Sequence, residues 1–166
     1  ADYRDHPEVI QALVTLCEQS CNATDRKALL VEVKDDPKLS PELREGYLVR
    51  LTQLRTNSGE CGDIQKELES LPVEAVPPVR AKLQYAHGVC RHKAREWAAA
   101  RTALLDVRDL PEYHAGVYSL RRDSHHELQD WKGLAEEVAH AHETHPDILE
   151  SGDYALWVEA RRQVQD

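Results

Sequence analysis

Four cysteines are the side chains of this 166-residue chain that could carry the most chemistry. We expect three of them, Cys21, Cys61 and Cys90, at the same rim of the fold, because each stands at a helix end or turn of the pattern described below. Together with Cys17 they allow three interpretations. They are unmodified buried thiols, one or two disulfides with Cys61–Cys90 as the first pairing, or a zinc site. No C-x-x-C spacing is present, so we expect no metal site.

Nine histidines form the second group with possible chemistry. They include His140, His142 and His145 in the stretch HAHETH, and the adjacent His125 and His126. On a helix, His142 and His145 can share a face while His140 points away from them. We therefore expect mostly solvated imidazoles. A metal- or redox-responsive helical protein, which would use the cysteine rim and the histidines, is the alternative.

The familiar motifs of catalysis are missing from the sequence. It has no glycine-rich phosphate loop, no G-x-S-x-G and no H-E-x-x-H. Cys90 and His92 are two positions apart and point to different faces of a helix, which disfavours a thiolate–imidazole couple. We expect no enzyme activity and no cofactor. An all-helical enzyme domain is a second alternative, because catalytic residues from distant helices leave no local motif.

The charge of the chain limits its partners. Asp and Glu number 30 against 21 Lys and Arg, a formal net charge of −9. We therefore expect no nucleic-acid binding, since a basic face would have to outweigh these carboxylates. No apolar run approaches the roughly 20 residues of a membrane span, so we expect no membrane insertion. The chain begins at Ala1 rather than Met, as a processed product would; the cytoplasm is slightly favoured over export, and the compartment stays open.

The elements that must position these residues are helices. Prolines stand where helices begin or have just ended, and the apolar residues between them recur with helical spacing. In the first helix this stripe is Val9, Leu13 and Leu16, with Ile10 and Cys17 beside it. We predict an all-α fold of about nine helices and no strand, in a single domain over 1–166. We predict four helix hairpins over 7–37, 41–72, 78–108 and 112–144. A capping helix over 147–165 follows the last hairpin.

Two tryptophans mark an internal repeat, since Trp131 follows Trp97 by 34 residues. A small residue, Gly88, precedes Trp97 by nine positions, and another, Ala100, follows it by three. After Trp97 the apolar residues Leu104 and Val107 continue the pattern. After Trp131 it continues with Leu134, Val138, Ala141 and Pro146. This spacing resembles the 34-residue unit of tetratricopeptide repeats. Arg122 and Leu54 depart from it in a slot for a small residue, and Pro111 comes one residue early.

The resemblance implies an antiparallel helix-hairpin array, an α-solenoid with a right-handed superhelix. It also implies a groove, lined by the first helix of each hairpin, that binds an extended or helical peptide. The expected groove residues are Arg55, Lys82, Tyr85, Val89, His92, Lys93 and His126. Several are basic, which suggests a carboxylate-bearing peptide; ordinary surface residues are the alternative. We therefore expect a non-catalytic protein–protein interaction module, such as an adaptor, assembly factor or chaperone-like scaffold.

Overall fold

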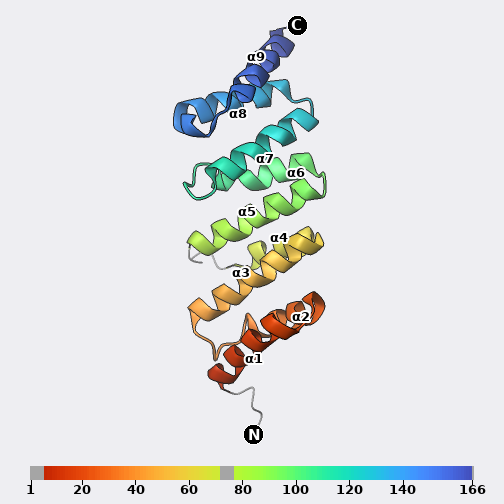
Figure 1. The fold of residues 1–166 in the computed structure, drawn as a ribbon, viewed down its shortest axis with the longest axis vertical. Coiled ribbons are helices and arrows are strands. Elements are labelled where there is room, and N and C mark those ends of the chain that lie inside the picture. Colours follow the sequence, from red (N-terminus) through yellow and green to blue (C-terminus); the bar gives the residue numbers. More distant parts are fainter. Residues whose placement is uncertain (1–5, 72–76, 166) are drawn as a thin grey trace. The chain divides into compact units, whose positions relative to one another are not determined.

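The computed structural model describes residues 6–71 and 77–165, and Figure 1 shows its fold. These residues form helices and no strand, which confirms the predicted all-α class. The nine α-helices and two 3-10 helices of the described residues are α1 Pro7–Ser20, α2 Ala23–Val33, α3 Pro41–Ser58, α4 Cys61–Ser70, α5 Pro77–Lys93, α6 Trp97–Leu104, η2 Leu105–Val107, α7 His114–Glu127, α8 Trp131–Thr144, η3 Pro146–Ile148 and α9 Ser151–Gln165.

Local signals in the sequence explain where several helices begin. Both α1 and α3 have proline in their first turn, where the missing N–H removes no helical hydrogen bond. The hydroxyl of Ser40 accepts the N–H of Leu43 at 3.4 Å, and the Asn22 side chain accepts the N–H of Asp25 at 2.9 Å. These side chains satisfy N–H groups that have no partner within the helix.

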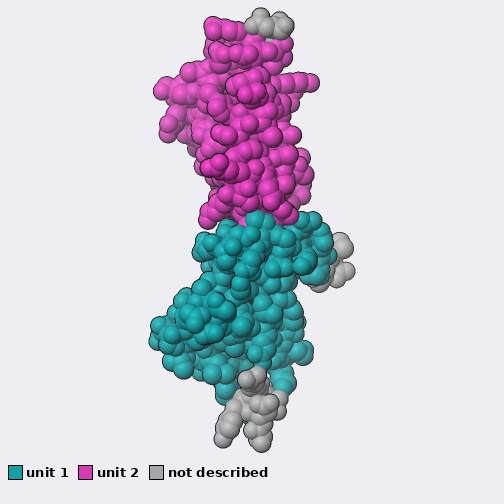
Figure 2. Space-filling view, turned by 90° about the vertical axis from the view of Figure 1, so that its right-hand side faces the viewer, with its two compact units in different colours: residues 1–83 teal, residues 84–166 magenta. Residues whose placement is uncertain are grey.

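The chain divides into two compact units, Ala1–Leu83 and Gln84–Asp166 (Figure 2). The boundary falls inside α5, whose first turns belong to unit 1 and whose remainder belongs to unit 2.

In unit 1, each helix packs on the next one along the chain, from α1 to α4. Two apolar clusters result because α3 presents residues to both of its neighbours. The first cluster joins α1, α2 and α3 through Ile10, Val14, Leu30, Val33, Leu39, Tyr47 and Leu51. The second joins α3, α4 and the start of α5 through Leu48, Leu68, Val79 and Leu83.

In unit 2, sequence neighbours again pack together, from α6 to α9. The cluster of α7, α8 and α9 contains Tyr118, Leu134, Val138, Ala141 and Ala160. At the other side of the unit, α5 approaches α6 closely: a Cβ added at Gly88 would overlap the fully buried Leu104 side chain. Glycine at position 88 therefore allows the close packing of α5 on α6.

Three hairpin turns share one backbone conformation. Gly59, Arg95 and Gln129 have φ of 76°, 60° and 54°, and each stands two residues before the start of α4, α6 or α8. The residue after each of them donates its N–H to the carbonyl five positions earlier, at 2.9 Å in all three turns. This is the hydrogen bond that closes a helix with a left-handed residue. The first hairpin turns differently, with Cys21 in an extended conformation.

The spacing between these turns differs along the chain. Gly59 and Arg95 are 36 residues apart, whereas Arg95 and Gln129 are 34 apart. Gly88 lies seven residues before Arg95, and the residue seven before Gly59 is the buried Thr52. The Thr52 hydroxyl donates to the carbonyl of Leu48 at 2.8 Å. The slot for a small residue that the resemblance places at Leu54 stays a prediction.

Candidate functional site

A groove of about 450 Å³ runs along α3 and the first turns of α5 in unit 1. It lies on the first helices of two successive hairpins, where the sequence analysis placed a ligand groove. Its lining residues are Glu42, Glu45, Gly46, Val49, Arg50, Gln53, Val79 and Lys82. Valine and glycine therefore form an apolar part, which charged side chains of both signs border.

Lys82 is the predicted groove residue that this surface contains. Its side chain is exposed, and it makes no ion pair with any residue in the described part of the chain. The second cation, Arg50, is already paired with Glu18 of α1 and lies 5.8 Å from the centroid of the Tyr47 ring. Lys82 is thus the cation of this groove best placed to meet a ligand carboxylate.

Arg55 occupies a different environment from Lys82. It is buried on α3, and its Nη1 donates to Oε1 of Glu67 on α4 at 2.8 Å. Lys34, which follows α2, approaches the other oxygen of Glu67 at 3.1 Å. This carboxylate therefore links α3, α4 and the end of α2, and the charge of Arg55 is compensated within the unit. A role for Arg55 in binding stays a prediction.

The other predicted groove residues lie in unit 2. Tyr85 stacks on Tyr113 with ring centroids 4.9 Å apart. Val89 is half-buried and Lys93 is exposed, both on α5.

Two of these residues, His92 and His126, repeat one contact. Each precedes a tryptophan by five residues and meets it edge to face: His92 with Trp97 at 4.9 Å, and His126 with Trp131 at 5.7 Å between centroids. Both imidazoles pack on a tryptophan of the following helix, and their role in binding stays a prediction.

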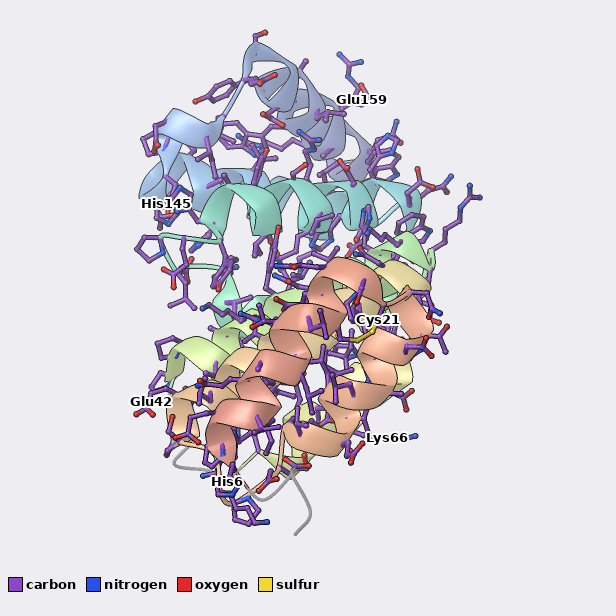
Figure 3. The ribbon with its side chains drawn as sticks, turned by 60° about the horizontal axis from the view of Figure 1, so that its bottom comes forward. His6, Cys21, Glu42, Lys66, His145 and Glu159 are labelled. Atoms are coloured by element: carbon purple, nitrogen blue, oxygen red, sulfur yellow. A yellow bond between two sulfur atoms is a disulfide. The ribbon has the colours of Figure 1, made fainter. Side chains whose placement is uncertain are left out.

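The cysteines are oxidised in the structure. Cys17, in the last turn of α1, is bonded to Cys21, which follows the helix (Figure 3). Cys61 and Cys90 are also in disulfide form. Of the three interpretations, the structure therefore confirms disulfides. The pairing of Cys61 with Cys90 stays a prediction; Cys61 belongs to unit 1 and Cys90 to unit 2.

The histidines contact aromatic and acidic groups. His114 and His145 stack in parallel with centroids 4.3 Å apart, and Nε2 of His140 lies 2.6 Å from Oδ1 of Asp109. His142 lies against Tyr154 of α9, with Nδ1 3.2 Å from the hydroxyl. Within residues 6–71 and 77–165, no group of three or more His, Cys, Asp or Glu side chains is arranged to hold a metal ion.

A buried ionic network in unit 2 was not predicted from the sequence. Arg121 on α7 donates through Nε and Nη2 to the Glu137 carboxylate on α8 at 2.8–3.0 Å, and through Nη1 to the carbonyl of Arg101 at 2.6 Å. Glu137 is only 3% exposed and Arg121 6%. Pairing compensates the cost of burying both charges, and the network ties α6, α7 and α8 together.

His125 borders this network. Its Nδ1 lies 3.0 Å from Oδ2 of Asp130 and 3.1 Å from Nη1 of Arg101, which also pairs with Asp130. Burial lowers the pKa of His125 below its ordinary value, and the charge of Arg101 acts in the same direction. Burial alone would raise the pKa of Asp130, but the Gly133 N–H, His125 and Arg101 bring it below its ordinary value.

A second groove, in unit 1, was also missed. It has a volume of about 300 Å³ and lies along α1 and α2. The structure buries Ile10, Val14 and Cys17 of α1, whereas Leu13 and Leu16 of the predicted stripe are 41% and 60% exposed. The sequence did contain a signal for this surface, since apolar residues cover more of α1 than one packed face requires.

No described helix is long and apolar enough to cross a membrane. Comparison of the chain with protein-family models, with curated proteins and with solved structures found no match. Any functional assignment must therefore come from the geometry described above.

Proposed function

We propose that this chain is a non-catalytic protein-interaction module of divergent tetratricopeptide-like hairpins. The interval between the left-handed residues Arg95 and Gln129 is 34 residues, the same as between the two tryptophans, and this supports the repeat. Hairpins of this kind cannot bury their inner faces alone and stack on one another, leaving the first helices to line a groove. Protein binding by such a groove is an inference from fold-level analogy.

The observation that carries the proposal is the α3–α5 groove with Lys82 at its edge. The groove combines an apolar part, at Val49 and Val79, with an exposed cation that has no ion-pair partner in the described part of the chain. An apolar side chain next to a carboxylate is the ligand chemistry that matches both features. We propose a peptide whose terminal or side-chain carboxylate meets Lys82.

The first testable prediction concerns this contact. A library of short peptides with an apolar residue beside a C-terminal carboxylate is screened by fluorescence anisotropy, and every binder is compared with its C-terminal amide. We expect Lys82→Glu and the amides each to weaken binding about tenfold or more, since a hydrogen bond to a charged group contributes about 1.5–3 kcal/mol.

The control is Lys66→Glu, which makes the same charge change on α4 of the same unit, at a side chain that is 78% exposed. It should bind as the unmodified protein does, and circular dichroism should show both variants folded. Equal binding by Lys82→Glu, equal binding of the amides, or no binder in the library would contradict the proposal.

The oxidation state of the cysteines supports a location for this module. Disulfides persist in oxidising compartments and are rare in the cytosol. We therefore propose an oxidising compartment, in place of the slight preference for the cytoplasm drawn from the sequence.

A further inference from the structure

The exposed large apolar side chains of the described residues gather on the first and last helices. Five of the eight lie there: Leu13 and Leu16 on α1, and Tyr154, Val158 and Val164 on α9. Apolar surface concentrated on two helices indicates an interaction surface rather than scattered exposure.

The surface on α1 forms part of the α1–α2 groove. Its apolar wall and floor consist of Ile10, Leu13, Leu16, Cys17, Leu29 and Val33. The charged residues that line it are both acidic, Glu32 on α2 and Asp36 in the segment after it. This groove therefore suits a helix that carries apolar residues next to basic ones.

The open face of α9 has this chemistry. Tyr154, Val158 and Arg162 follow one another at four-residue spacing, so they share a face, and Arg161 lies beside them. Val158 is 62% exposed. Arg162 is held only by a solvent-exposed pair with Glu159 at 3.4 Å, and such pairs contribute little to stability. Its guanidinium can therefore exchange that partner for a carboxylate of another molecule.

We propose that the α1–α2 groove of one copy of this chain binds the open face of α9 of a second copy. Val158 would cover Leu13 and Leu16, and the arginines of α9 would face Glu32 and Asp36. The contact joins two different surfaces, so a pair joined by one contact still offers one free groove and one free α9. Two copies can close this contact on each other, and more copies can form a larger ring or an open chain.

Sedimentation equilibrium of the full chain tests the proposal. For the unmodified protein we expect the weight-average mass to rise with concentration above the value for one chain. Leu16→Asp and Val158→Asp should each abolish this rise. Both side chains are exposed, so circular dichroism should show both variants folded. If Leu16→Asp does not fold, Leu16→Gln takes its place.

Mixing the two variants gives the sharper result. Leu16→Asp keeps an intact α9 and Val158→Asp keeps an intact groove, so an equimolar mixture should form a one-to-one complex and nothing larger. Arg162→Glu should weaken association several-fold. Leu105→Asp is the control, since Leu105 of η2 is also an exposed leucine, 49% against 60% for Leu16; this variant should associate as the unmodified protein does. A monomer at every concentration, association by either aspartate variant alone, or no complex in the mixture would overturn the proposal.

Discussion

The side chain of His125 shows how burial selects a protonation state. It packs beside Arg101 and the Arg121–Glu137 pair, where burial lowers its pKa. The folded state therefore binds a proton at this imidazole less readily than the unfolded chain does, where the pKa has its ordinary value of 6.5. Because protons bind preferentially to the unfolded state, His125 costs stability as the pH falls below about 6.5.

We predict that His125→Gln removes this contribution. Chemical unfolding of the unmodified protein and the variant should give a difference in the free energy of unfolding that is constant above pH 7.5. Below about pH 6.5 the difference should shift in favour of the variant, because only the unmodified protein has an imidazole that binds a proton more readily in the unfolded state. A difference that stays constant from pH 7.5 to 5 would contradict the lowered pKa.

Gly88 and Gly46 make opposite predictions for the same substitution. Gly88→Ala should destabilise the fold by about 1–3 kcal/mol, because its Cβ would overlap the buried Leu104. Gly46→Ala adds a methyl group where no atom lies within 4 Å, and it should stabilise α3 by about 0.5–1 kcal/mol. Thermal and urea unfolding of the two variants measures both. Equal effects would mean that α5 and α6 do not pack closely at Gly88.

At the scale of elements, the turn before α8 requires a residue in the left-handed region. Gln129 has a φ of 54°, a conformation that costs most residues about 1–2 kcal/mol and glycine much less. We predict that Gln129→Gly stabilises the protein by about 0.5–1 kcal/mol. The substitution removes backbone strain from the folded state, and this gain exceeds the loss that results because glycine makes the unfolded chain more flexible.

The control for this prediction is Gln65→Gly, in the interior of α4. It should cost about 1 kcal/mol, since glycine is a poor helix former. Urea unfolding shows whether each substitution raises or lowers the free energy of unfolding. A destabilised Gln129→Gly would show that the turn does not need a left-handed residue, and would remove the structural basis for the repeat.

The helices themselves were predictable from the sequence, and their packing faces were less so. Proline, Ser40 and Asn22 act on adjacent residues, so their effect can be read without the fold. The apolar residues of α1 cover a wider arc of the helix surface than one helix–helix contact buries. Which part of the arc is buried depends on where α2 and α3 lie, and the structure selects Ile10 and Val14 over Leu13 and Leu16.

At the scale of the whole molecule, the chain consists of two compact units that share α5. The proposed sites need only one unit each: the α3–α5 and α1–α2 grooves belong to unit 1, and α9 belongs to unit 2. A peptide in the first groove and a second copy in the other would meet different surfaces, so the two experiments are independent. Variants at Lys82 should leave association intact, and variants at Leu16 should leave peptide binding intact.

The sequence alone determined the helical class and most of the helix positions, because periodicity and capping are local properties. Only the tertiary structure decided that Arg121 and Glu137 are buried together and that Arg55 is compensated by Glu67. Each of these two contacts joins residues of different helices, 16 and 12 positions apart, and no short-range pattern encodes their approach.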